Sequence, residues 1–377
     1  MQSFAEQQIA GVRDDAFRRV SPPTLTGAAM AWAPLLEQAL AAPLEGALPD
    51  ARRIVVVISD STRDEPRAEF LRAVERRFPV AELRVLIASG THTPDVGALP
   101  PEFAHLAARA HDSTDASMLR SFGVTRRGTR VRLARELGEA DLVLCTGRIR
   151  PHYFAGYSAG VKGVFPGCAF REDILANHLL KAEPGARLGI LSGNPCREDM
   201  EEAALMLGDR LRVLNVLADV EGRPIAAVCG HPLRAHRALA ARAREVFGVK
   251  LTRARVLVVA DRPPLSESLY QASKMLAVGE LGVLPRGTVV LVADCARGTG
   301  PLLRVNQGIF ELGLRPRLPE GVQVRLVSRL SEGEVKRTYA GFAPNLAAEL
   351  ARLHVDRHEP ASLVWRAGEC VPEPVGG

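Results

Sequence analysis

Residues 53–90 read "RIVVVISDSTRDEPRAEFLRAVERRFPVAELRVLIASG", and this stretch decides the fold. The apolar, β-branched run at 53–60 is typical of a strand that is buried on both faces of a parallel sheet. Residues 61–78 pass through a loop into a helix, for which Asp64 is the expected N-cap. A second apolar run follows at 82–90. Strand, helix and strand within about forty residues predict a βαβ unit.

The same alternation continues along the chain. A third buried strand is predicted at 141–147 and a helix at 173–183. A second series is predicted with strands at 253–261, 287–295 and 322–328 and with helices at 266–281, 302–313 and 332–353. We therefore expect an α/β protein of two domains with mainly parallel, doubly wound sheets and an active-site cleft between them. The expected boundary near 247–254 gives domains at 1–250 and 251–377, with the C-terminal tail able to pack back on the first domain.

The composition is that of an ordinary globular protein. Of the 377 residues, 47% are hydrophobic and 24% are charged. No apolar run is long enough for a membrane-spanning helix, and the first residues lack the basic-then-apolar pattern of a secretory signal, so a cytoplasmic location is expected. The six cysteines are scattered, which argues against a zinc ribbon, an iron–sulfur site or a CxxC redox pair.

The basic residues favour a small anionic ligand over nucleic acid. The net charge is +6, but the basic residues are spread along the chain and form no run or aromatic-interleaved stripe. Arginine supplies 44 of the 49 basic residues. A lysine is therefore a mild indication of chemistry that arginine cannot perform, such as the use of a free amine as a nucleophile.

Three polar loops follow the three predicted strands of the first series. They are "DSTR" at 60–63, "GTHTP" at 90–94 and "GRIRPH" at 147–152. Ligands gather at the carboxyl ends of strands in open parallel sheets. We therefore expect five side chains to lie near one sheet edge: Asp60, Thr62, Arg63, His92 and His152. Each alone has a structural alternative, such as a helix cap or a turn residue, but their coincidence at one edge favours a site.

The segment "PHYFAGYSAGVKGVFPGCAFREDILANH" at 151–178 is the densest in possible chemistry. Two histidines, His152 and His178, flank Lys162, which lies among small residues that expose the backbone. A surface charge and a packed helix histidine are the structural alternatives for Lys162 and His178.

Taken together, these motifs and "YQASK" at 270–274 resemble the nickel-dependent lactate racemase family over most of the chain. The resemblance implies a nickel-pincer nucleotide, which is a pyridinium bisthiocarboxylate mononucleotide whose nickel is held by two sulfurs, one ring carbon and one histidine. It implies that Lys162 tethers this cofactor, that His178 binds nickel, and that His92 and His152 are the paired acid/base residues. The remaining implied contacts are the cofactor loop Asp60, Ser61, Thr62 and Arg63, with Arg63 also near substrate, and the substrate-binding residues Tyr270, Gln271 and Lys274.

This chain departs from the family pattern beside the lysine. Ala159 stands where the family often has a second glycine, and Val161 stands where many members have a basic residue. An alanine is tolerated at this position if its φ is negative.

The resemblance implies an isomerase that racemises or epimerises a lactate-like 2-hydroxy acid by proton-coupled hydride transfer. The alternatives are a larger 2-hydroxy acid such as malate, an aromatic lactate or a sugar acid, a non-catalytic nickel-nucleotide binding protein, and a Schiff-base enzyme. Arg148 and Arg150 either pair with a second substrate carboxylate or are solvated loop residues. Cofactor-biosynthesis proteins are possible partners, neither nucleic acid nor a membrane is expected, and the oligomeric state is left open.

Overall fold

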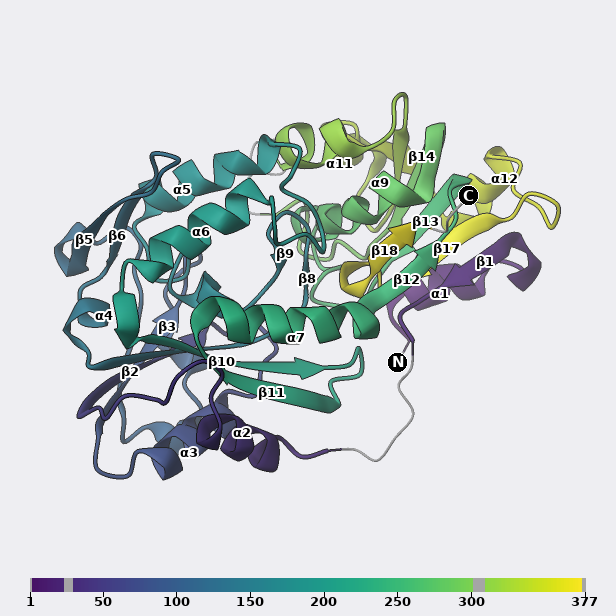
Figure 1. Cartoon of the computed structure of the whole chain (residues 1–377). Coiled ribbons are helices and arrows are strands. Elements are labelled where there is room, and N and C mark those ends of the chain that lie inside the picture. Colours follow the sequence, from purple (N-terminus) through teal and green to yellow (C-terminus); the bar gives the residue numbers. More distant parts are fainter. Residues whose placement is uncertain (1, 24–29, 301–308, 375–377) are drawn as a thin grey trace.

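The computed structural model describes residues 2–23, 30–300 and 309–374. Two six-stranded sheets lie side by side in two halves of the molecule (Figure 1). The N-terminal sheet has the order β11-β10-β7-β2-β3-β4, and the C-terminal sheet has the order β1-β17-β13-β14-β15-β16. Every neighbouring pair is parallel except β10 with β11. The expected α/β class with mainly parallel sheets is confirmed.

The N-terminal sheet contains the strands that were predicted at 53–60, 82–90 and 141–147. Its strands are β2 (Arg53–Ser59), β3 (Glu82–Ala88), β4 (Ala107–Ala110), β7 (Leu142–Arg148), β10 (Leu211–Ala218) and β11 (Pro224–Gly230). The helices of this half are α2 (Trp32–Ala41), α3 (Arg67–Arg77), α4 (Glu136–Glu139), α5 (Arg171–Leu179), α6 (Pro195–Leu205) and α7 (Pro232–Phe247). Two small hairpins complete it, β5 (Leu119–Val124) with β6 (Arg130–Ala134) and β8 (Pro151–His152) with β9 (Gly156–Tyr157).

Both faces of β2 are buried, as its unbroken apolar run predicted. Ile54, Val56 and Ile58 belong to the core formed with α2 and α3. Val55 and Val57 belong to the core on the opposite face, which α6 and residues 161–169 share. Successive side chains of a strand point to opposite faces, so a strand covered on both sides must be apolar throughout.

The C-terminal sheet includes the strands predicted in the second series. Its strands are β1 (Phe17–Val20), β13 (Ala254–Ala260), β14 (Val283–Val292), β15 (Gln323–Val327), β16 (Gly341–Ala343) and β17 (Ala361–Trp365). Its α-helices are α1 (Phe4–Ala10), α8 (Leu269–Ala272), α9 (Gly279–Gly282), α11 (Glu332–Val335) and α12 (Leu346–Arg352).

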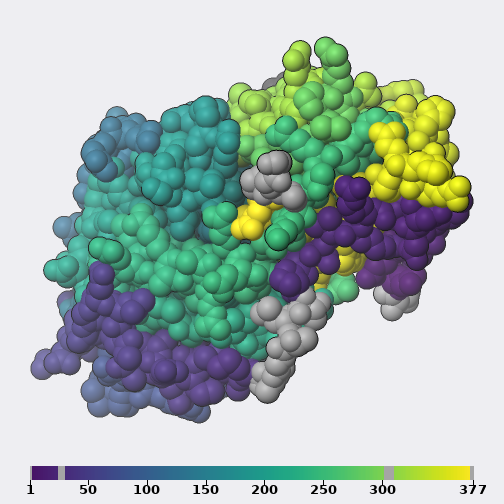
Figure 2. Space-filling view, turned by 45° about the vertical axis from the view of Figure 1, so that its right-hand side comes forward, coloured from purple at the N-terminus to yellow at the C-terminus, as the bar shows by residue number. Residues whose placement is uncertain are grey.

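The N-terminus belongs structurally to the C-terminal half. Strand β1 pairs in parallel with β17, and α1 contacts α12. Figures 1 and 2 show this first segment, in purple, against the yellow C-terminal elements. We expected all of residues 1–250 to belong to the first domain, whereas β1 pairs with a strand of the C-terminal sheet. The chain crosses between the halves at β12 (Gly248–Leu251), which pairs with the C-terminal strand β18 (Val371–Pro374).

Three expectations about helices need correction. The single helix predicted at 332–353 is wrong: α11 and α12 are separated by β16, because Asn345 caps a new helix by accepting the Ala348 N–H at 2.8 Å. Asp64 is not an N-cap, since α3 begins after Pro66 without a side-chain cap. The helix predicted at 266–281 is broken by a 3-10 segment at Ser273–Val278. The helix predicted at 302–313 falls largely outside the described residues, and Ile309–Leu314 forms a π-helical turn.

Two further expectations can be compared with the structure. All six cysteines are buried and free of disulfide bonds, as scattered reduced thiols require. No helix among the described residues is long and apolar enough to cross a membrane.

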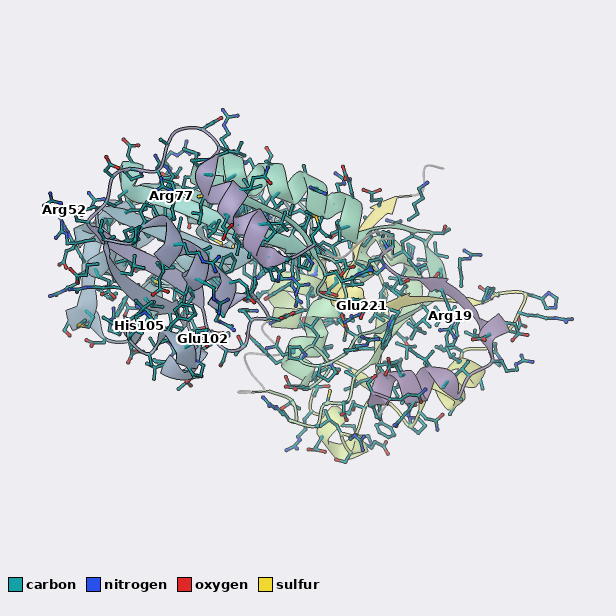
Figure 3. All side chains as sticks on the ribbon, turned by 90° about the horizontal axis from the view of Figure 1, so that it is seen from below. Arg19, Arg52, Arg77, Glu102, His105 and Glu221 are labelled. Carbon is teal, nitrogen blue, oxygen red and sulfur yellow. The ribbon has the colours of Figure 1, made fainter. Side chains whose placement is uncertain are left out.

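The strand order places a topological switch point in each sheet. In the N-terminal sheet the order reverses between β2 and β7, and in the C-terminal sheet it reverses between β13 and β17. Ligand sites form outside the carboxyl ends of strands at such points. Charged residues that follow β7, β10 and β17 join the two halves. Arg150 pairs with Glu369 at 3.4 Å, and Glu221, labelled in Figure 3, pairs with Arg366 at 3.2 Å.

Candidate active site

His92 and Asp60 are brought together by the loops that follow β3 and β2. The Nδ1 atom of His92 lies 2.7 Å from Oδ2 of Asp60. Although burial acts to raise it, the hydrogen bonds from His92 and Thr62 hold the pKa of Asp60 below its usual value. With Nδ1–H donated to the carboxylate, Nε2 of His92 is the ring nitrogen that can accept a proton from a ligand. This pair has the form of an oriented general base.

The loop at 60–63 is held in shape from within the protein. The buried Glu65 carboxylate accepts the backbone N–H of Ser59 at 2.8 Å. Arg67 donates to the carbonyl oxygens of Ser59, Asp60 and Arg63. Both groups support the loop from the start of α3, so the exposed Ser61, Thr62 and Arg63 are presented to solvent on a fixed backbone. Ser61 Oγ also donates to Asp95 at 3.0 Å.

His152 lies in the small hairpin after β7 and has a different environment. Its Nδ1 atom accepts the backbone N–H of Ala155 at 3.2 Å, so the neutral ring carries its proton on Nε2 and presents it to a ligand as a hydrogen-bond donor. Burial, followed by the charges of Lys162, Arg63 and Lys274, lowers the pKa of His152 well below its usual value. The ring is therefore neutral at physiological pH, and it lies among the cations that the resemblance assigned to the cofactor and the substrate.

Phe154 connects three of the candidate residues and was not singled out from the sequence. Its ring meets those of His152 and His178 edge to face, with centroid distances of 4.6 and 5.1 Å. The Lys162 ammonium lies 5.6 Å from the same ring centroid. An aromatic residue two positions after a candidate histidine was the available signal, but spacing alone does not distinguish it from an ordinary core residue.

Lys162 is a desolvated amine. Its Nζ atom lies 3.9 Å from the Met200 sulfur on α6. Burial, and then the positive charge of Arg197, lower the pKa of Lys162 to about 7. This lowering of the pKa favours the unprotonated amine, which is the state that acts as a nucleophile. The sequence drew attention to Lys162 because lysine is rare in this chain, but Met200 and Arg197 become its neighbours only through the fold.

The backbone before Lys162 is strained and tightly packed. Ala159 has φ of 57° and ψ of −153°, so the condition under which an alanine is tolerated here, a negative φ, is not met. A Cβ on Gly147 would lie 2.9 Å from the Ala159 Cβ, so the glycine makes room for the alanine. A Cβ on Gly160 would lie 2.6 Å from the His236 ring and 2.7 Å from Arg197. The loop therefore fits closely against its support.

Arg197 and His236 form that support beneath the Lys162 loop. Both side chains are fully buried. Arg197 donates to Glu201 at 2.9 Å and to Nδ1 of His236 at 3.0 Å, and the other ring nitrogen of His236 lies 2.8 Å from the Ser158 carbonyl oxygen. A histidine on the apolar face of α7 was the available sequence signal for His236.

His178 lies in the last turn of α5. Burial, followed by the charges of Lys162 and Lys181, lowers the pKa of His178 to about 3, although the Ile174 carbonyl one turn earlier opposes this shift. Its Nδ1 atom is buried and has no hydrogen-bond partner of standard geometry among the described residues. A neutral imidazole with an unpartnered buried nitrogen has the properties of a metal ligand.

Residues of the C-terminal half reach the same region. Lys274 donates to Gln271 Oε1 at 2.6 Å, as their expected placement on one helix face allows, and its Nζ atom lies 4.9 Å from the Tyr270 ring centroid. Burial, and then the charges of Arg63 and Lys162, lower the pKa of Lys274 to about 7. The positive charges of Arg63, Lys162 and Lys274, which come from both halves, thus act on one another. This concentration of positive charge favours an anionic ligand.

Arg148 and Arg150 do not offer free cations to a substrate. Arg148 is 7% exposed and donates to Asp64 at 2.6 Å and to the Asp219 carbonyl at 2.8 Å. Arg150 donates to the same Asp64 carboxylate at 2.8 Å and pairs with Glu369. These protein carboxylates disfavour the interpretation of both residues as ligands of a second substrate carboxylate, and the buried Arg148 does not fit the alternative of a solvated loop residue either.

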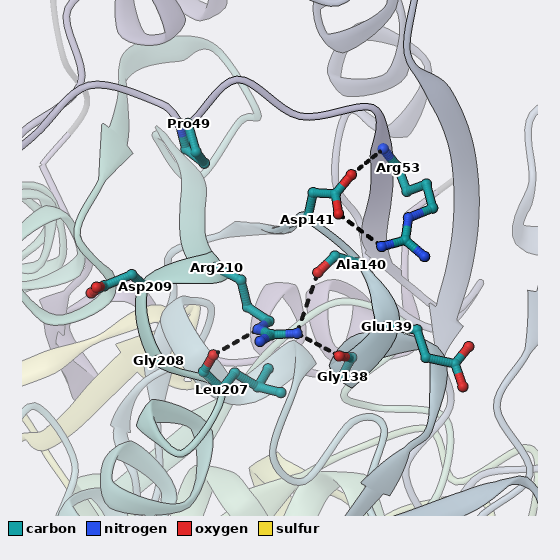
Figure 4. Close-up of a pocket in the computed structure, with 10 residues that line it drawn as sticks. All are labelled: Pro49, Arg53, Gly138, Glu139, Ala140, Asp141, Leu207, Gly208, Asp209 and Arg210. Carbon is teal, nitrogen blue, oxygen red and sulfur yellow. Dashed lines mark hydrogen bonds and ion pairs between the residues drawn. The ribbon is translucent and has the colours of Figure 1, made fainter.

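Two other features of the described residues do not provide an alternative site. No group of three or more His, Cys, Asp or Glu side chains in the described part of the chain is arranged to hold a metal ion. A surface pocket lies at the amino ends of β2, β7 and β10, where Asp141 pairs with Arg53 and Arg210 donates to backbone carbonyls (Figure 4). This pocket is at the sheet edge opposite the loops that carry the candidate residues.

Comparisons with known proteins agree with the resemblance found in the sequence. Residues 12–189 match the family described as Lactate racemase N-terminal domain. The lactate racemase of Thermoanaerobacterium thermosaccharolyticum is 28% identical over 291 residues, which are 74% of this chain and 67% of that protein. The lactate racemase of Lactiplantibacillus plantarum is 30% identical over 260 residues, which are 66% of this chain and 61% of that protein. The enzyme class implied by both names is isomerase, as expected.

Solved structures share the fold. The lactate racemase apoprotein from T. thermosaccharolyticum superimposes with a TM-score of 0.83 at 23% identity, covering 96% of each chain. A protein from Thermotoga maritima superimposes with a TM-score of 0.69 at 15% identity, covering 93% of this chain and all of that one. Together with the matched N-terminal domain and the two relatives, this shared architecture makes the chain similar to lactate racemases in both sequence and fold.

Proposed function

We propose that this chain is a racemase or epimerase of 2-hydroxy acids that works with a nickel-pincer nucleotide. The observation that carries the proposal is the meeting, around Phe154, of a desolvated lysine amine, an unpartnered imidazole and the acid/base candidate His152. A second acid/base candidate, His92, is oriented by a carboxylate.

The residues present fit the implied cofactor. The described residues hold no cluster of protein metal ligands, so a nickel ion here needs donors from another molecule besides a single histidine. Among the described residues, the His178 Nδ1 atom is buried without a hydrogen-bond partner of standard geometry, and the pKa of the Lys162 amine is lowered to about 7. Sulfur donors with one imidazole are suitable ligands for nickel. In this assignment His178 binds the metal, Lys162 forms the amide-type link, and the 60–63 loop holds the nucleotide.

The bound nucleotide supplies a hydride acceptor. The protein's own contribution is to bind and orient the 2-hydroxy acid and to move its hydroxyl proton. We assign this transfer to His92 and His152, one histidine for each enantiomer, which accounts for reaction in both directions. His152 can accept a proton at Nε2 only in the tautomer that carries its ring proton on Nδ1, in which the bond from the Ala155 N–H is released. Asp60 stabilises the charge that His92 gains on accepting a proton.

Cationic and polar side chains account for recognition of the substrate carboxylate. Arg63, Lys274 and Gln271 carry donors suited to a carboxylate, and charge-assisted hydrogen bonds to a carboxylate are stronger than neutral ones. Since Arg148 and Arg150 are engaged by Asp64, we propose a substrate with one carboxylate, such as lactate or a larger monocarboxylic 2-hydroxy acid, over malate. We place the substrate between the two halves.

The test is anaerobic purification from cells that make the cofactor. We expect stoichiometric nickel, a mass adduct on the peptide that contains Lys162, and racemisation of at least one 2-hydroxy acid. Lys162→Arg is expected to lack the adduct, and His178→Ala is expected to lose nickel. An adduct on another lysine, or full nickel retention in His178→Ala, would contradict the assignment of Lys162 as the tether and of His178 as the nickel ligand. Stoichiometric nickel without racemisation of any 2-hydroxy acid would favour the binding-protein alternative.

A further inference from the structure

Arg317 joins the C-terminal half to both segments that carry the half-buried candidate histidines His152 and His178. It lies at the end of a short 3-10 turn, Arg315–Arg317. One guanidinium nitrogen donates to the Tyr153 carbonyl at 2.9 Å, and the other donates to the Lys181 carbonyl at 2.8 Å. Tyr153 follows His152 directly, and Lys181 is three residues after His178.

The bond to Lys181 completes the end of the helix that carries His178. Helix α5 continues into a 3-10 turn at Leu180–Ala182. The N–H that would bond the Lys181 carbonyl in a further 3-10 turn belongs to residue 184, which is a proline and has none. The last carbonyls of a helix need partners from outside it, and a cation at this end is favourable. Arg317 supplies both a hydrogen-bond partner for the Lys181 carbonyl and a cation at this end of the helix.

The bond to Tyr153 acts on the loop of His152. The Tyr153 ring stacks on the His152 ring with a centroid distance of 5.4 Å, and the Ala155 N–H two residues later bonds His152 Nδ1. Fixing the Tyr153 carbonyl therefore limits the movement of the peptide between His152 and its hydrogen-bond donor.

We propose that Arg317 is a positioning residue, which holds the His152 loop and the His178 helix at a fixed separation from a point in the other half of the molecule. The planar guanidinium is suited to this role because its two nitrogens reach two carbonyls in one fixed geometry. The inference rests on the proposed function, since it is through His152 and His178 that Arg317 acts on the reaction.

A matched control is available at the same interface. Arg187 also crosses between the halves, where it pairs with Glu280 at 3.0 Å, but its side chain is nearly half exposed and touches neither histidine segment through this contact. Arg187→Gln removes a cross-half cation without removing a bond to residues 152–155 or 178–182.

The first test is amide hydrogen exchange of the full-length protein without cofactor. In Arg317→Gln, the amides of residues 153–157 and 179–183 are expected to exchange at least about tenfold faster than in the parent protein, because exchange follows local opening. Arg187→Gln is expected to leave those peptides unchanged. Unchanged exchange in Arg317→Gln, or an equal increase across both sheets, would overturn the proposal.

The second test uses cofactor-loaded enzyme. We expect kcat of Arg317→Gln to fall about tenfold or more while KM for the 2-hydroxy acid changes by less than about threefold, because misplacement of reacting groups lowers the rate without removing a substrate contact. Arg317→Lys keeps the charge but lacks the fixed two-nitrogen geometry of the guanidinium, so it is expected to be intermediate, and it serves as the variant if Arg317→Gln does not fold. An unchanged kcat in both variants would overturn the positioning role. Absence of racemisation in the parent protein would instead count against the proposed function, while the exchange experiment would still decide whether Arg317 fixes the two segments.

Discussion

The Nδ1 atom of His92 lies 2.7 Å from Oδ2 of Asp60, whereas Nδ1 of His152 accepts a backbone N–H from Ala155. The two acid/base candidates are therefore oriented by different groups, one by a carboxylate and the other by a peptide. Only His92 has a direct carboxylate partner to stabilise its protonated form.

Asp60→Asn should test the importance of that partner. The amide can still bond the ring, but it cannot stabilise the charged imidazolium, so kcat of loaded enzyme is expected to fall by about a hundredfold or more. Nickel content should remain that of the parent protein. Asp95→Asn is the matched control, because Asp95 is an exposed carboxylate that bonds Ser61 in the same loop, and a change of less than about threefold is expected. Equal losses of activity in the two variants would contradict the assignment of Asp60.

The pH dependence of Lys162 acylation can be measured without the cofactor. Because burial and Arg197 lower the pKa of this lysine to about 7, its neutral form increases as the pH rises through about 7. Brief labelling with acetic anhydride from pH 5 to 10, read by peptide mass spectrometry, should give a midpoint near 7. The exposed Lys336 provides an internal reference for reagent decay. A midpoint above about 9 would show that the amine is not desolvated in this way.

His236 should make stability depend on pH in a defined direction. Burial, followed by the charge of Arg197, lowers the pKa of His236 well below 6.5 in the folded protein. The unfolded chain therefore binds the proton first, so the stability due to neutral His236 is fully present above about pH 6.5 and is lost as the pH falls below it. The loss is at most about 1.4 kcal/mol per pH unit.

Urea unfolding at pH 7.5, 6.5 and 5.5 measures this dependence. His236→Gln is expected to reduce the slope of the unfolding free energy against pH, whereas His105→Gln, at an exposed histidine paired with Glu75, should leave the slope closer to that of the parent protein. A slope in His236→Gln identical to the parent's would rule out a buried neutral His236 as its source.

The strained alanine beside the tether lysine gives a stability prediction. Ala159 has φ of 57° and ψ of −153°, a region that only glycine occupies readily. Ala159→Gly is expected to raise the free energy of unfolding by about 1 kcal/mol. Gly147→Ala is expected to lower it by about 1–3 kcal/mol, because the added Cβ would meet Ala159. Thermal unfolding of both variants measures these changes in stability. A lower stability of Ala159→Gly would contradict the inference that the Ala159 backbone is strained.

The predictions from sequence were strongest where one local pattern determines the outcome. The apolar runs of β2, β3 and β7 predicted buried parallel strands, and the loops after them brought Asp60 and His92 together. The family resemblance, carried by motifs at fixed spacing, agrees with the matched N-terminal domain. The roles of Lys162 and His178 remain predictions.

Prediction from the sequence was weakest where segments that are far apart along the chain come into contact. Arg197, His236 and Arg317 act on the site across long separations along the chain, and no spacing rule brings them there. The pairing of β1 with β17 is a contact between the two ends of the chain, which local periodicity does not contain. Helix periodicity also missed β16, since the Pro344 and Asn345 break lies inside a run of otherwise helix-compatible residues.

The most direct measurement is the conversion of one pure enantiomer by anaerobically prepared, nickel-loaded enzyme in heavy water. Chiral chromatography follows the appearance of the opposite enantiomer, and mass spectrometry follows the hydrogen on the α-carbon. We predict conversion to the racemic mixture with the α-hydrogen retained, and a loss of about a hundredfold or more in rate when either His92 or His152 is replaced by Asn. Incorporation of solvent deuterium at the α-carbon during turnover, or no conversion of any 2-hydroxy acid by fully loaded protein, would contradict it.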